Sequence, residues 1–425
     1  MTLRLIECLG TTEEIAELFS DRSVLESMLW FEVGLARAQA RLGLIPRSAA
    51  ESIASAALAE KFDAAALARE ARGSATIAIP FVKAMTARVR EVDDRSALFV
   101  HWGATSQDLV DTALIRLLGR AREILWRDHQ RLTDMLRTLS ERHAGTVMLA
   151  RTLLQPAPPI TFGYKAAGWY GTLKRNWRRL EESFTDAVQL QFGGAAGTLA
   201  SYGARGTELA AELGKELNLP VPIAPWHAHR DRLAGVVTAC GIYSGSLGKI
   251  ARDVTLLMQQ EVGEVSEPGG GSSAMPHKRN PAGSVIALAS AARVPGLVST
   301  YLGLMIQEHE RAAGGWQAEW QTIAEVLGAT GSALAAVADA VEHLEVNVGR
   351  MRANLEAMQG AVLSEKAVML LGEQPGAREL VAGALRKAAE TGESLENILG
   401  LSLGQVEDYL GATEIFRQQL LKDSE

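Results

Sequence analysis

The stretch Gly269–Pro281, with the sequence GGGSSAMPHKRNP, contains side chains that could perform acid–base chemistry on an anion. Its three glycines leave backbone N–H groups open to an anion. Ser272 and Ser273 follow, and the positive charge around Lys278 would help one hydroxyl to lose its proton. The residue order fits neither a Walker A loop nor a G-x-S-x-G elbow. Composition alone equally allows a solvated linker.

A second stretch, HWGATSQD at residues 101–108, precedes a strongly periodic segment. The spacing of Thr105 and Asp108 predicts a capping box at a helix start. The free N–H groups of such a start, with the hydroxyls of Thr105 and Ser106, could also bind a carboxylate. His101 could hydrogen-bond a substrate or serve the fold alone.

Three further stretches are polar but individually weak. Residues 151–163 form a Pro-rich break that reads as a loop and contains Arg151, Thr152 and Gln155. Residues 307–316, with Arg311, read as a charged helix face. Residues 225–232 carry two histidines at i and i+2, which do not share a helix face. No metal site is therefore expected.

The elements that must position these residues are helical. Apolar residues recur at three- and four-residue steps from residue 105 to 143, which predicts a helix about 50 Å long. Similar patterns cover 161–182, 231–264 and 282–343, the last with a kink expected at Pro295. Shorter helices are predicted at 23–43 and 375–391. We expect an all-α fold in three parts, residues 1–104, a central long-helix bundle at 105–345, and 346–425.

Composition narrows the class of protein. The 425 residues are 47% hydrophobic and 22% charged, which excludes a disordered chain. A net charge of −7 offers no electrostatic footprint for nucleic acid or for an anionic membrane. Two distant cysteines form neither a disulfide framework nor a zinc motif, so a reducing cytoplasm is expected. We predict no signal peptide and no membrane span.

The stretches above, in this order, resemble the fumarase/aspartase superfamily. The most specific match is S-S-x-M-P-x-K-x-N, which runs from Ser272 to Asn280. The resemblance implies an all-α fold of three domains and a homotetramer in which three subunits build each active site. It implies a small polycarboxylate substrate and no metal or organic cofactor.

The resemblance also assigns roles. Ser272 would be the general base that removes a proton beside a carboxylate, and Lys278 and Asn280 would stabilise the resulting aci-carboxylate. The expected substrate contacts are His101, Thr105, Ser106, Arg151, Thr152, Gln155, Ser273 and Arg311.

Departures from the superfamily's pattern select a branch. Leu153 stands where fumarases and adenylosuccinate lyases carry a histidine, and Gly314 and Trp320 replace a Ser and an Arg that contact a nucleotide phosphate. A nucleotide substrate is thereby disfavoured. The pattern is similar to the cycloisomerases that interconvert 3-carboxy-cis,cis-muconate and its lactone. A lyase that eliminates an amine or similar group from a succinyl-type acid is the alternative. A non-catalytic helical scaffold is a third, against which the intact Ser272, Lys278 and Asn280 argue.

Overall fold

The computed structural model describes residues 4–271, 274–275, 277–372 and 374–422. Helices dominate, so the all-α prediction is confirmed. Contacts divide the chain into two compact units: unit 1 holds residues 1–127, 176–245 and 289–333, and unit 2 holds residues 128–175, 246–288 and 334–425. The division into three domains at residues 104 and 345 stays a prediction.

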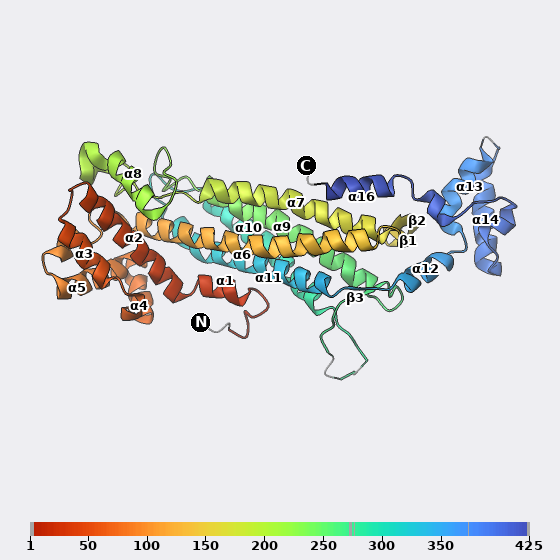
Figure 1. The fold of residues 1–425 in the computed structure, drawn as a ribbon, viewed down its shortest axis with the longest axis horizontal. Coiled ribbons are helices and arrows are strands. Elements are labelled where there is room, and N and C mark those ends of the chain that lie inside the picture. Colours follow the sequence, from red (N-terminus) through yellow and green to blue (C-terminus); the bar gives the residue numbers. More distant parts are fainter. Residues whose placement is uncertain (1–3, 272–273, 276, 373, 423–425) are drawn as a thin grey trace. The chain divides into compact units, whose positions relative to one another are not determined.

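Unit 1 contains a set of shorter helices around an apolar core (Figure 1). They are α2 (Asp21–Arg41), α3 (Arg47–Ala56), α4 (Ala64–Ser74), α5 (Ala78–Val92) and α8 (Gly206–Leu217), with short 3-10 turns at Ala59–Lys61, Ser96–Phe99 and Ala200–Arg205. The short α1 (Glu13–Leu18) precedes them in the same unit. Phe31, Phe81 and Leu209 are fully buried in this core. Ser20 caps α2 by accepting a hydrogen bond from the Ser23 N–H, which explains why that helix begins before the predicted residue 23.

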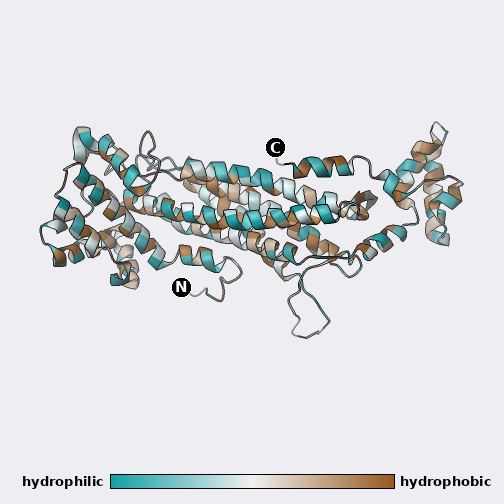
Figure 2. Ribbon diagram, in the orientation of Figure 1, coloured by the Kyte–Doolittle hydropathy of each residue, from teal (hydrophilic) through white to brown (hydrophobic). Residues whose placement is uncertain are grey.

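Five long helices have residues in both units. They are α6 (Ser106–Arg142), α7 (Phe162–Ala187), α9 (Asp231–Leu257), α10 (Ala282–Leu304) and α11 (Gly315–Glu342). Hydrophilic and hydrophobic residues alternate around α6, as its three- and four-residue spacing requires (Figure 2). The predicted helix at 105–143 is therefore confirmed to within one residue at each end.

The single helix predicted over 282–343 is wrong. The chain leaves helical geometry between α10 and α11, where His309 has φ +46° and Gly314 has φ +108°. A φ of that size is open to glycine and excludes helix continuation. Residues 307–316, read as a charged helix face, are thus mostly an irregular connection that presents Arg311. The helix predicted to reach residue 264 also ends early, at Leu257.

Unit 2 contains the two small sheets of the described chain. β1 (Val147–Thr152) pairs antiparallel with β2 (Gln155–Thr161), and β3 (Val265–Ser266) pairs with β4 (Glu345–Val346). The shorter helices of this unit are α12 (Val348–Glu356), α13 (Ser364–Leu371), α14 (Ala377–Thr391), α15 (Leu395–Leu399) and α16 (Thr413–Leu421), with 3-10 turns at Ala361–Leu363 and Val406–Tyr409. The Pro-rich stretch 151–163, read as a loop, is therefore mainly a hairpin.

Among the residues that the structure describes, three helices are long and apolar enough to cross a membrane by length and composition. The most apolar windows of α9 and α11 are 61% and 78% buried within the protein. Their apolar character therefore serves mainly to fill the core. The corresponding window of α10 is only 22% buried, so most of that helix surface is unpartnered in a single chain.

A buried ionic cluster lies in unit 1. The Arg230 guanidinium donates to Asp111 at 2.7 and 3.1 Å and to Glu319 at 2.7 Å, and all three side chains are fully buried. Trp316 Nε1 donates to Asp111 at 2.9 Å, and Gln307 Nε2 donates to Glu319 at 2.8 Å. Burial raises the pKa of Glu319, against the opposing effect of Arg230. The cluster ties α6, the start of α9 and α11 together by paired charge.

The β1–β2 turn is strained and apolar. Leu153 and Leu154 occupy its two central positions with φ +51° and +65°, and their side chains are 96% and 74% exposed. Positive φ at both positions is the requirement of a type I′ turn, which favours Asn-Gly. Each leucine there costs about 1–2 kcal/mol.

We expect the double substitution Leu153→Asn, Leu154→Gly to raise the free energy of unfolding by about 1–2 kcal/mol, because relief of the strain at both positions is partly offset by the greater freedom of glycine in the unfolded chain. Urea unfolding followed by circular dichroism measures the change. The control is Leu153→Ala, Leu154→Ala, which removes the apolar side chains but keeps a Cβ at both positive-φ positions. Equal midpoints for the parent and the Asn-Gly variant would show that the turn is not strained.

We expect Arg230→Met to lower the free energy of unfolding by about 3–5 kcal/mol, since it leaves two buried carboxylates without their cation. Arg232→Met is the matched control: Arg232 lies two residues away, is half-buried and donates to Gln189 at 2.7 Å, so its loss should cost about 1 kcal/mol or less. Equal midpoints for the two variants would contradict the assignment.

Candidate functional site

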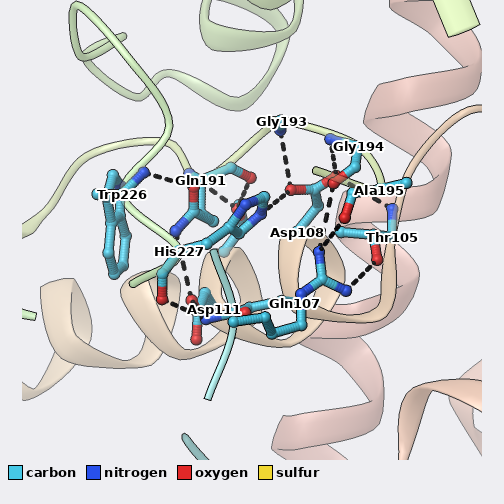
Figure 3. Close-up of polar contacts among 12 residues, drawn as sticks. Thr105, Gln107, Asp108, Asp111, Gln191, Gly193, Gly194, Ala195, Trp226 and His227 are labelled. Carbon is cyan, nitrogen blue, oxygen red and sulfur yellow. Dashed lines mark hydrogen bonds and ion pairs between the residues drawn. The ribbon is translucent and has the colours of Figure 1, made fainter. Parts of the chain in front are cut away.

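The start of α6 is organised around the buried carboxylate of Asp108 (Figure 3). Gly193 N–H and Gly194 N–H donate to it at 2.9 and 2.8 Å, and the His227 ring contacts it through Nε2 at 2.7 Å. The Thr105 N–H is a further donor, at 3.0 Å. Asp108 therefore fixes two distant loops against the first turn of the helix.

The predicted capping box is only half present. The Thr105 N–H donates to Asp108, but the recorded partner of the Thr105 hydroxyl is Arg311, whose Nη1 donates to it at 2.7 Å. Arg311 Nη2 donates to the carbonyl oxygens of Ala195 at 3.0 Å and Gly194 at 3.4 Å. Figure 3 shows Thr105, Gly194 and Ala195 close together beside the helix start.

This arrangement suits an anion. The first N–H groups of a helix have no acceptor within the helix, and its N-terminus carries partial positive charge. The Arg311 guanidinium adds a full charge to the same place, and Ser106, the first residue of α6, is partly exposed there. A carboxylate would find both charge and hydrogen-bond donors at this point.

His101 lies just before this helix start and pairs with a residue that the sequence did not single out. Its ring Nδ1 is 2.6 Å from Glu32 Oε1, and its backbone N–H donates to Glu32 Oε2 at 3.0 Å. The available signal was a lone acidic residue inside an apolar helical run, MLWFEVGLA. Such a residue is almost always paired when buried.

Unit 2 holds the predicted residues of the hairpin. Arg151 makes a bidentate ion pair with Glu264, at 2.8 and 2.7 Å, and Asn354 Nδ2 donates to the same carboxylate at 2.9 Å. Arg151 is thus held by the fold. Thr152 and Gln155 face each other across the turn and are exposed.

Lys165, in the first turn of α7, is a second residue that the sequence analysis missed. Burial lowers the pKa of its ammonium group, and the neighbouring Lys249 and Arg151 act in the same direction. The charges of Asp253 and Glu264 oppose this effect. The signal in the sequence was a lysine among small and aromatic residues, TFGYKAAGW, at the start of an amphipathic helix.

The segment from Gly270 to Asn280, here called the signature segment, has its two ends joined by hydrogen bonds, which form its closed base in unit 2. Gly270 and Asn280 exchange two backbone hydrogen bonds of 3.1 Å, and the Ser284 hydroxyl donates to Glu267 at 3.1 Å. The side-chain amide of Asn280 donates to the Gly271 carbonyl oxygen at 3.5 Å, and Lys278 is exposed. Ser272 and Ser273 lie outside the described residues.

The structure thus assembles the predicted residues in two groups. Unit 1 brings together His101, Thr105, Ser106 and Arg311. Unit 2 carries Arg151, Thr152, Gln155, Lys278 and Asn280. Within the described part of the chain, no three His, Cys, Asp or Glu side chains are grouped so that they could hold a metal ion. His227, considered for a metal, is instead a partner of Asp108.

The chain is similar to several proteins of known activity. The 3-carboxy-cis,cis-muconate cycloisomerase of Bradyrhizobium diazoefficiens is 46% identical over 402 residues, covering 93% of this chain and 89% of that protein. A nitrosuccinate lyase of Streptomyces davaonensis is 40% identical over 421 residues, covering 96% and 88%. The crystal structure of 3-carboxy-cis,cis-muconate lactonizing enzyme from Pseudomonas putida matches with a TM-score of 0.94 and 39% identity, covering 99% of both chains.

A family model described as lyase matches residues 7–296, which is more than half of the sequence. Together with identities of 40% and above over nearly the whole length, this match settles the family. The chain belongs to the lyase family of the fumarase/aspartase superfamily.

Proposed function

We propose that this chain is a cycloisomerase that interconverts 3-carboxy-cis,cis-muconate and carboxymuconolactone. The observation that carries the proposal is the contact of Arg311 with Thr105 at the start of α6, because it joins a guanidinium, hydroxyls and helix N–H groups into a receptor for a carboxylate. The 46% identity to a cycloisomerase of that name supports the choice of substrate.

In the lactonising direction the reaction forms one C–O bond and consumes one proton, which solvent returns to Ser272 after the serine has delivered its own, so atoms and charge balance with no other co-reactant. In the lactonising direction, one substrate carboxylate adds to the conjugated double bond, and charge collects as an aci-carboxylate on another. A proton then reaches the adjacent carbon from Ser272; in reverse, the Ser272 alkoxide removes that proton. Lys278 and Asn280 stabilise the developing negative charge. No cofactor is expected.

Leu153 fits this chemistry. When the lactone opens, the departing group is a carboxylate, which ionises with a pKa of about 4 and leaves as a stable anion. An amine or alkoxide would need a proton donor to leave. Fumarases and adenylosuccinate lyases carry a histidine at this turn. A cycloisomerase can carry a leucine there, because its leaving carboxylate needs no proton donor.

A second candidate is a lyase that eliminates a group from a substituted succinate. The 40% identity to a nitrosuccinate lyase favours it specifically. The same carboxylate receptor and serine base would serve that reaction. The two candidates differ in product: the lyase releases fumarate from a succinate, whereas the cycloisomerase releases nothing.

We also propose a homotetramer with shared active sites in the cytoplasm. The support is α10, whose most apolar window is 22% buried and whose single charged residue is Arg293. Val285 and Leu302 on this helix are about half exposed. A face of this kind on one chain calls for a partner, and a second copy supplies an equally apolar helix.

We expect the protein to consume 3-carboxymuconate, seen as loss of its ultraviolet absorbance, and Ser272→Ala to lower kcat by at least about 100-fold because the base is gone. Ser55→Ala, an exposed serine on α3, is the matched control, and circular dichroism checks helicity. Full activity of Ser272→Ala would refute the base. Fumarate release from a substituted succinate, without turnover of carboxymuconate, would favour the lyase.

We expect the parent chain to be tetrameric by light scattering at micromolar concentration, and Ala292→Glu on exposed α10 to dissociate it, because a buried unpaired charge is costly. The control is Leu380→Glu on α14, an exposed position outside the apolar helix. A parent chain that is monomeric and fully active would contradict the proposed homotetramer with shared active sites.

A further inference from the structure

Glu32 is a buried carboxylate whose two oxygens are both used by one residue. The Glu32 side chain is 1% exposed on α2, and its hydrogen bonds go to the backbone N–H and to ring Nδ1 of His101. A buried acid normally satisfies its oxygens with several partners. Here the whole carboxylate serves to hold one histidine.

His101 is held in a conformation that it would not adopt by itself. Its φ of +55° lies in the left-handed region, which is unfavourable for a residue with a Cβ. The two hydrogen bonds from Glu32 fix both the backbone and the ring at that point. The strain is therefore tied to the placement of the imidazole.

The pairing also settles which ring nitrogen is available. Since Glu32 accepts at Nδ1, that nitrogen carries a proton, and Nε2 has no hydrogen-bond partner among the described residues. The His101 side chain is 14% exposed, so it is not sealed from solvent. A histidine fixed through Nδ1 by a carboxylate, with Nε2 available, is suited to donate to an anion once protonated.

The surroundings favour the protonated ring. Burial lowers the pKa of His101, but the charge and hydrogen bond of Glu32 and the charge of Asp108 on α6 together raise it above its ordinary value. Tyr202 also lies near Glu32 and Asp108, and burial raises its pKa, so it stays neutral. Arg311 contacts Thr105, four residues along the chain from His101.

We propose that Glu32 is a positioning residue that keeps His101 as an imidazolium, so that Nε2–H binds a substrate carboxylate beside the Arg311–Thr105 pair. This inference rests on the proposed function for its substrate class, a polycarboxylate. Glu32 itself touches no substrate. Its contribution is a cation whose charge depends on pH, in addition to the permanent charge of Arg311.

The test is Glu32→Gln, which keeps the size of the side chain and removes its charge. The probe is propane-1,2,3-tricarboxylate, an unreactive tricarboxylate, titrated by calorimetry between pH 5.5 and 8.5. Histidine-labelled protein gives the His101 titration by NMR. In the parent, the raised pKa means that the imidazolium and tight binding persist below it and are lost as pH rises through it.

We expect Glu32→Gln to lower the pKa of His101, move the loss of binding to lower pH, and weaken binding at pH 7 by about tenfold. With carboxymuconate, KM should rise more than kcat falls, because the contact holds substrate and transition state alike. Glu26→Gln, an exposed acid on the same helix that pairs with Arg22, should change none of these.

A purely structural role for Glu32 would reduce stability and leave the pH midpoints of His101 and of binding in place, which would overturn the proposal. If Glu32→Gln folds poorly, His101→Gln provides the second test: it should abolish the loss of probe binding as the pH rises towards 8.5, leaving only the opposite effect of the probe's own last carboxyl group near pH 5.5. Unchanged pH dependence would also overturn it. Because the probe does not react, these outcomes are independent of whether carboxymuconate is the substrate.

Discussion

Four hydrogen bonds meet at the carboxylate of Asp108, and the unit 1 candidate site depends on that meeting point. The donors come from Thr105 at the helix start, from Gly193 and Gly194, and from His227, residues that lie up to 119 positions away in sequence. A buried carboxylate is stable only when hydrogen-bond donors such as these satisfy its oxygens. Because Asp108 accepts from the N–H groups of Gly193 and Gly194, it fixes the loop whose next carbonyl oxygens, those of Gly194 and Ala195, accept from Arg311 and orient it.

The candidate site combines permanent and conditional charge. Arg311 stays charged throughout the pH range of living cells, whereas His101 is charged according to its partner Glu32. A polycarboxylate needs several cations, yet several fixed cations near one another repel before the substrate arrives. His101 limits that repulsion, because the negative charge of its partner Glu32 on α2 lies next to it.

The spacing of residues along the sequence correctly predicted those features that depend on interactions between near neighbours in the chain. The long helix α6 and its start at Thr105 and Ser106 followed from periodicity and capping residues. The Arg230 cluster and the Glu32–His101 pair could not be predicted, because they join residues that only the folded chain brings together. The break between α10 and α11 was missed because Glu, Arg and Ala in this stretch are good helix formers. Their presence predicted a continuous helix, although Gly314 adopts a positive φ that ends helical geometry.

The hairpin was missed for a different reason. Pro156, Pro158 and Pro159 lack N–H donors and argue against a central strand, but a two-stranded ribbon has only edges and tolerates them. The branch of the superfamily, in contrast, was predicted from a resemblance to the cycloisomerases, with Leu153, Gly314 and Trp320 as the departures from the other branches. Identity of 46% to a muconate cycloisomerase agrees with that choice.

The closed base of the signature segment, made by Gly270 with Asn280 and by Glu267 with Ser284, has an evolutionary consequence. Insertions or deletions between such fixed ends leave the helical framework untouched, and doubling the length of a flexible loop costs only about 0.6 kcal/mol. Natural lineages and protein engineers alike can therefore change the length of this segment with little risk to folding, provided that Ser272, Lys278 and Asn280 are kept.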